Sequence, residues 1–134
     1  WEMCALGGFL MGREAARRML PRARGTILFT GATASLRGAA GFSAFAGGKH
    51  ALRALAQSMA RELGPQGIHV AHVVIDGAID TAFIRDNFPQ AYALKDQGGI
   101  LSPDHIADMY AMLHSQPRDA WTHELDLRPW TEKW

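Results

Sequence analysis

The sequence predicts an α/β fold in which a parallel sheet is flanked by helices, and three observations support this. Helix-like and strand-like segments alternate along the chain, which is the order expected of parallel strands joined by crossover helices. The segment 68–75 is apolar except for two histidines, as in a strand covered on both faces. The 134 residues contain no internal repeat or low-complexity linker, so we expect one unit over residues 1–134.

The first half of the chain predicts two helices and the strand between them. A helix is expected over 6–20, where apolar residues are interleaved with arginines before Pro21 ends it. A short buried strand is expected over 25–31, followed by a loop of small residues over 32–41. The clearest helix is expected over 42–63. Its apolar residues recur every three or four positions, at Leu52, Leu55, Ala56, Met59 and Leu63.

The second half predicts two further strands with helices between them. A strand is expected over 68–75, and the mixed signals over 80–99 allow short helices at most. Ser102-Pro103-Asp104 has the sequence features of a helix start, with Ser102 as the cap and the proline at the first helical position. The helix is expected to lead from there into 106–114. A last strand is expected over 122–127.

Composition and charge exclude several classes of function. Fourteen Lys and Arg residues against thirteen Asp and Glu residues leave a net charge of +1, which argues against nucleic-acid or membrane binding through bulk charge. No apolar run approaches the roughly 20 residues needed to span a bilayer. Cys4 is the one cysteine, so no internal disulfide can form. Cysteine usage therefore favours a reducing compartment, and we expect a cytoplasmic protein.

The phosphate-binding and metal-binding motifs are not matched. The residues after Thr30-Gly31 do not follow the pattern G-x-G-x-x-G, and those around Gly48-Lys49 do not form a phosphate loop. His69 and His72 are three positions apart on an expected strand, so they point to opposite faces and cannot chelate one ion together. The remaining histidines are isolated in sequence. We therefore predict no metal site.

One stretch of the chain resembles the C-terminal half of the short-chain dehydrogenase/reductase family. It runs from Gly25 to Thr81 and contains the text ILFTGATASLRGAAGFSAFAGGKHALRALAQSMARELGPQGIHVAHVVIDGAIDT. The order of strand, glycine-containing loop, helix and apolar strand is similar to that of the family, and so is the body of the helix. Leu6-Gly7-Gly8-Phe9 also resembles the preceding family helix. The resemblance implies a Rossmann-like fold that lacks its N-terminal nucleotide-binding half, so that 1–134 is a partial domain.

The resemblance assigns four catalytic positions, three of which are altered. Lys49 keeps the family's lysine, whereas Phe45 stands at the position of the catalytic tyrosine and has no proton to give. Ala32 stands at the serine position and Cys4 at the asparagine position. The family's proline is replaced by Asp76.

Two rescues of the missing hydroxyl groups stay open. Thr33 or Ser35 could supply a hydroxyl if the loop shifts, and Tyr92 could enter the site from the segment that often forms a substrate lid in this family.

The resemblance also implies a cofactor and several functions. NAD or NADP would contact Lys49, Gly77, Ile79 and Thr81, with weak or no binding, because the phosphate-binding half should lie before residue 1. The implied activity is oxidation or reduction of a small alcohol or carbonyl substrate, impaired in this chain. Alternatives are a non-catalytic module for interaction or cofactor sensing, and an inactive fragment. A homo-oligomer through the helices 6–20 and 42–63 is also implied.

Overall fold

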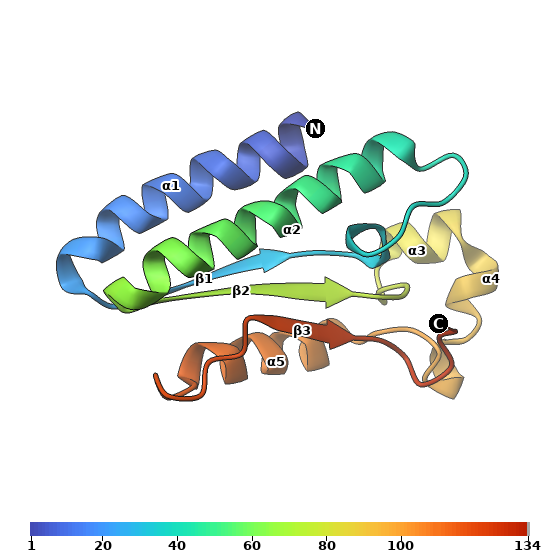
Figure 1. Ribbon diagram of the computed structural model, residues 1–134. Helices are drawn as coiled ribbons and strands as arrows, with labels where there is room; N and C mark the ends of the chain where they lie inside the picture. The colour runs from blue at the N-terminus through green and yellow to red at the C-terminus, as the bar shows by residue number, and fades with distance from the viewer. Residues whose placement is uncertain (134) are drawn as a thin grey trace.

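Three parallel strands lie at the centre of the molecule in the order β1-β2-β3 (Figure 1). Their bounds are β1 Gly25–Thr30, β2 Ile68–Ile75 and β3 Glu124–Leu127. Gly25 is opposite Ile68 and His72 is opposite Glu124. The structure, a computed structural model, describes residues 1–133; Trp134 of the expected unit lies outside the described residues. The predicted parallel sheet is confirmed.

Helices cover both faces of this sheet. Helices α1 (Gly7–Met19) and α2 (Ser43–Leu63) pack on one face, and α5 (Pro103–Ser115) packs on the other. Even-numbered residues of β2, such as Ile68 and Val70, face α1 and α2, because side chains alternate along a strand. Odd-numbered residues of β2 face Leu113 of α5. The chain therefore forms three layers, with helices outside and the sheet in the middle (Figure 1).

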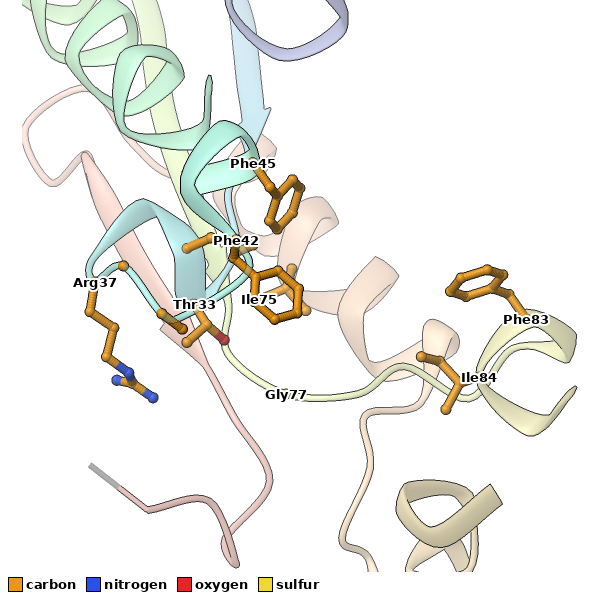
Figure 2. Close-up of a pocket in the computed structure, with 12 residues that line it drawn as sticks. Thr33, Arg37, Phe42, Phe45, Ile75, Gly77, Phe83 and Ile84 are labelled. Carbon is orange, nitrogen blue, oxygen red and sulfur yellow. The ribbon is translucent and has the colours of Figure 1, made fainter. Parts of the chain in front are cut away.

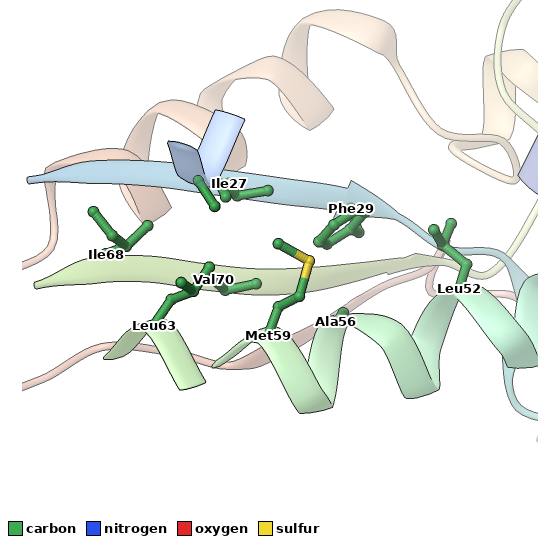
Figure 3. Close-up of a cluster of buried hydrophobic side chains, with 9 residues drawn as sticks. Ile27, Phe29, Leu52, Ala56, Met59, Leu63, Ile68 and Val70 are labelled. Carbon is green, nitrogen blue, oxygen red and sulfur yellow. The ribbon is translucent and has the colours of Figure 1, made fainter. Parts of the chain in front are cut away.

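A cluster of buried apolar side chains, which we call the core cluster, fills the space between α2, α1 and the sheet (Figure 3). It consists of Ala16, Ile27, Phe29, Leu52, Ala56, Met59, Leu63, Ile68 and Val70. The three- and four-residue spacing of the α2 members places them on one face of that helix, as the sequence predicts. Helix α2 ends at Leu63, and Pro65 follows in a short 3-10 turn, Gly64–Gln66, closed by Gly67 with a φ of 83°.

Two expected starts of elements are wrong by one or two residues, and one expected cap does not form. The first helix begins at Gly7, because the preceding turn, Glu2–Leu6, is π-helical. Ser102 precedes α5, but its hydroxyl makes no capping hydrogen bond. Strand β3 begins at Glu124 and not at Thr122. The carbonyl of Thr122 lies 2.8 Å from the His69 ring, and its N–H donates to Gln116, so the backbone of this residue is already engaged.

The segment between β2 and α5 contains short helices, as expected. These are α3 (Ala82–Asn87), α4 (Pro89–Tyr92) and the 3-10 turn Lys95–Gln97. Two more 3-10 turns lie at Leu20–Arg22 and Thr33–Ser35. Over residues 1–133, no helix combines the length and the apolar character needed to cross a bilayer.

Candidate functional site

A cavity of about 520 Å³ lies at the carboxyl ends of β1 and β2. Its walls come from the loop after β1, the start of α2, the end of β2 and helix α3 (Figure 2). The carboxyl edge of a parallel sheet is where such folds bind ligands. The lining residues are Ala32, Thr33, Ala34, Arg37, Gly38, Ala39, Phe42, Phe45, Ile75, Gly77, Phe83 and Ile84.

Most of this lining is apolar. Phe42, Phe45 and Phe83 are 55%, 44% and 64% exposed, respectively, which is high for phenylalanine. Phe83 approaches from α3, across the cavity from the other two rings (Figure 2). A concave site lined by aromatic and aliphatic side chains, with few polar groups, is suited to a small organic ligand.

The polar part of the lining is organised by Asp76, which follows β2 directly. Its carboxylate is fully buried and accepts a 2.5 Å hydrogen bond from the Thr33 hydroxyl. Arg37 lies 3.6 Å and Arg128 lies 3.5 Å from its two oxygens. Arg37 also lies 3.9 Å from Glu132. These contacts compensate the buried charge, and they tie the loop after β1 to the C-terminal segment.

The structure brings Phe45 and Lys49 together, one turn apart on α2. The Lys49 ammonium lies 5.8 Å from the centre of the Phe45 ring and donates a 2.8 Å hydrogen bond to the carbonyl of Thr30. A lysine so close to a tyrosine would favour the ionised phenol. The side chain at position 45 is a phenyl ring, however, so this charge acts on no proton donor there.

Ala32, which lines the same cavity, has no hydroxyl group, so the question is which nearby hydroxyl group reaches the cavity. The N–H of Ala32 donates to Ser35 Oγ over 3.1 Å, and Ser35 is fully buried and absent from the lining. Tyr92 is also absent from the lining; its hydroxyl lies 3.4 Å from the Lys95 ammonium. Thr33 is therefore the one of these three alternatives that reaches the cavity.

The positions expected at the cofactor are separated. Gly77 lines the cavity with a φ of 150°, and a Cβ there would lie 2.7 Å from Pro129, so glycine is required by the turn. Ile79 pairs with Leu101 in an isolated β-bridge. Thr81 caps α3, because its hydroxyl accepts a 3.3 Å hydrogen bond from the N–H of Ile84. Neither Ile79 nor Thr81 lines the cavity.

Cys4 lies away from the cavity, in the π-helical turn before α1. A Cβ added at Gly48 would lie 3.3 Å from that of Cys4, so the two segments are in close contact. The cysteine is half-buried and is absent from the cavity lining. The segment that Cys4 approaches is therefore α2 at Gly48, and Cys4 does not border the cavity that Phe45 and Ala32 line.

A second set of hydrogen-bonded polar side chains links α2 to β2 and β3 beside the core cluster. Arg53 of α2 donates two 2.7 Å hydrogen bonds to Glu124 of β3, whose carboxylate lies 3.0 Å from His72 Nδ1. Burial lowers the pKa of His72, although the hydrogen bond to Glu124 opposes this. The hydrogen bonds from Arg53 lower the pKa of Glu124. His69 points to the other face and stacks on Trp121 at 4.8 Å, as the strand period predicts.

Sequence reasoning missed most of the lining and the partner of Thr33. Asp76 was identified only as the replacement of a proline, and Arg37, Phe42 and Phe83 were not identified. One signal could have found the pair: Thr33 and Asp76 each follow a strand, and the carboxyl ends of neighbouring parallel strands meet at one edge.

Comparisons with known proteins agree with the fold. A family model described as short chain dehydrogenase matches residues 2–91. The chain is 32% identical over 114 residues to short chain aldehyde dehydrogenase 1 of Euphorbia lathyris, covering 81% of this chain and 40% of that protein. It is 47% identical to a short-chain dehydrogenase from Rhodopseudomonas palustris, with a TM-score of 0.75 over 97% of this chain and 50% of the other.

A further solved structure holds a cofactor. It is a 4-hydroxyisoleucine dehydrogenase complexed with NADH, 25% identical, with a TM-score of 0.75 over 92% of this chain and 54% of that chain. The present chain therefore spans about half the length of these solved structures and 40% of the curated relative.

Proposed function

The chain belongs to the short-chain dehydrogenase/reductase family, and we propose that it forms the substrate and nicotinamide side of an NAD(P)-dependent oxidoreductase whose catalysis is impaired in this chain. The substrate would be a small carbonyl compound or alcohol. The observation that carries this proposal is that Phe45 and Ala32 line one cavity, at the positions where the family resemblance expects tyrosine and serine. A phenyl ring and a methyl group cannot exchange a proton with a substrate oxygen.

The cofactor is NAD or NADP, and its binding to this chain is weak. Gly77 borders the cavity and Lys49 adjoins the Phe45 ring, so these two residues fit the nicotinamide end. Ile79 and Thr81, also expected there, are engaged in a bridge with Leu101 and in the cap of α3. When bound, the cofactor supplies or accepts a hydride. The sequence has no G-x-G-x-x-G turn for the pyrophosphate. A fluorescence titration giving low-micromolar NAD(P)H affinity would contradict weak binding of the cofactor.

The test of the proposed function restores both hydroxyl groups. The double variant Phe45→Tyr with Ala32→Ser should raise the reduction of 2-tetralone at millimolar NADH or NADPH by at least about 100-fold, because general acid–base catalysis contributes about 10²–10⁴-fold. The matched control is Phe42→Tyr, which adds a hydroxyl to a neighbouring ring of the same cavity. An equal rise in the control would refute the assignment of positions 45 and 32, and so would no rise in the double variant under conditions where the titration shows the cofactor bound.

The alternative function is a non-catalytic module that associates through its outer helices. The observation that favours it is the exposure of Leu6, Phe9 and Leu10, which are 51%, 46% and 40% exposed along α1 and the turn before it. A homo-oligomer that forms through the helices 6–20 and 42–63 would bury these three side chains. Sedimentation equilibrium separates the cases: Phe9→Glu should dissociate an oligomer, whereas Leu94→Glu, at an exposed leucine elsewhere, should not.

The proposed location is the cytoplasm. It is supported by the cysteine content, since Cys4 is the one cysteine in the sequence and no disulfide within the chain is possible.

A further inference from the structure

We infer that the cavity binds an apolar alcohol in preference to the matching ketone, and that the Thr33 hydroxyl oxygen accepts the hydrogen bond of that alcohol. This deepens the proposed function and rests on it in one respect, namely that the cavity is the substrate site. The inference concerns binding, so it can be tested without cofactor and without turnover.

The hydroxyl of Thr33 is fixed as an acceptor toward the cavity. A threonine hydroxyl has one proton to donate and two lone pairs to accept with. Its proton is committed to Asp76, because an ionised carboxylate can only accept and the oxygen atoms are 2.5 Å apart. Thr33 lines the cavity, so the lone pairs of its oxygen are what it offers to a ligand. A ligand that donates a hydrogen bond matches them.

The environment of Asp76 keeps this arrangement in place. The carboxylate has no exposure to solvent, so water does not compete for the Thr33 proton. The guanidinium groups of Arg37 and Arg128 lie within 3.6 Å of its oxygens, so the carboxylate, which can only accept hydrogen bonds, is paired with two cations. Asp76 thus acts as a positioning residue that sets the direction of the Thr33 hydrogen bond.

The other side chains of the lining offer few hydrogen-bond donors to a carbonyl oxygen. Phe42, Phe45 and Phe83 present rings, and apart from Thr33 and Arg37 the remaining members are alanine, isoleucine or glycine. The Arg37 guanidinium is directed away from the rings (Figure 2) and lies near Asp76 and Glu132. A ketone oxygen that enters the cavity loses its hydrogen bonds to water without gaining one from a side chain, which disfavours its binding.

The test compares 2-tetralol with 2-tetralone, which share a bicyclic apolar body and differ at the oxygen. Titrations of the full chain without cofactor, followed by the amide NMR signals of Gly38 and Gly77, give the two dissociation constants. We expect the alcohol to bind about three- to tenfold more tightly, the range that one net hydrogen bond supplies. Equal affinities or tighter binding of the ketone would overturn the inference.

Two variants assign the preference to Thr33. Thr33→Val keeps the shape of the side chain and should bring the two affinities within about twofold of each other. The matched control is Thr26→Val, at the other end of β1, where the hydroxyl lies 3.0 Å from His114; it should keep the wild-type preference. If Thr33→Val retains the preference for the alcohol, Thr33 is not the acceptor.

A third variant tests the part played by Asp76. In Asp76→Asn the amide can donate to the Thr33 oxygen, which frees the hydroxyl proton for a ketone, so the preference should fall or reverse. An unchanged preference in the folded variant would exclude Asp76 as the positioning residue. Should this variant unfold, the Thr33→Val comparison still decides the inference.

The pattern of shifts separates this inference from the proposed function. Cavity shifts of equal affinity with both compounds would refute the selection of an alcohol and leave the cavity as a ligand site. If neither compound shifts the signals of the cavity residues, the cavity is not the site for such substrates, and the substrate side of the proposed function fails with the inference.

Discussion

Helix α2 contributes to two regions that differ in their purpose, the core cluster and the cavity. Its later turns place Leu52 and Ala56 in the core cluster, where they are 6% and 0% exposed. Its first turn places Phe45 at the cavity, 44% exposed. The same helix thus buries one part of its apolar surface fully and leaves another part open. The apolar surface at the cavity adds little to folding, which leaves it available for binding a ligand.

The largest effect expected on stability is at the core cluster. Leu52→Ala should lower the free energy of unfolding by about 2–5 kcal/mol, because it leaves a space that the packed neighbours cannot fill. The matched change at the cavity, Phe45→Ala, removes a larger side chain and should cost less than about 1 kcal/mol, since the ring is half exposed. Urea unfolding followed by circular dichroism measures both. Equal losses would abolish the distinction between the two regions.

A smaller effect is expected at the polar wall of the cavity. Asp76→Ala removes the carboxylate that Thr33, Arg37 and Arg128 share, and should destabilise the chain by about 1–3 kcal/mol. The control is Asp126→Ala, which also removes an Arg128 partner but at a 32% exposed side chain, and should cost under about 1 kcal/mol. If the two variants lose the same stability, the buried carboxylate is no more important to the fold than a surface one.

The smallest effect expected is a dependence of stability on pH at the sheet. The pKa of His72 is lowered from its ordinary 6.5 by burial, so in mild acid the unfolded chain binds more protons at this residue than the folded chain. Stability should therefore fall as pH drops below 6.5. The pKa of Glu124 is lowered from 4.5 by its hydrogen bonds to Arg53 and His72, which adds a further loss as pH falls below 4.5.

The measurement is urea unfolding at pH 7.5 and pH 5.5, where the Glu124 contribution is still small. The wild-type chain should lose more stability between these values than His72→Gln, whose side chain does not titrate. His105→Gln, at an exposed histidine of α5, is the control and should behave as wild type. If His72→Gln loses as much stability between the two pH values as the wild-type chain does, the pH dependence of stability comes from other groups.

The helices and strands could be predicted from the sequence because each of them follows from a local pattern. The apolar run 68–75 coincides with β2, and the spacing of Leu52, Ala56 and Met59 predicted the buried face of α2. The site was harder, because its decisive contact joins Thr33 to Asp76 across 43 positions. No local pattern reports which way a hydroxyl donates.

The spacing of the family motif also did not show which of its residues line the cavity. Phe45, Ala32 and Gly77 do line one cavity, whereas Thr81 has a contact of its own as the cap of α3. The cap of α3 accounts for the Thr81 hydroxyl whether or not a ligand binds. The roles assigned to Lys49, Ile79 and Cys4 by resemblance stay predictions.

The parallel order of the strands has a consequence for how fast the chain can fold. No two strands are joined by a hairpin: the pairs Gly25 with Ile68 and His72 with Glu124 each bring together residues more than 40 positions apart. The entropy of closing such long loops is lost before any strand contact forms, so sheet formation should be the slow step. Helix α2, with 21 residues of local contacts, is the segment best able to form first and to collect the strands around it.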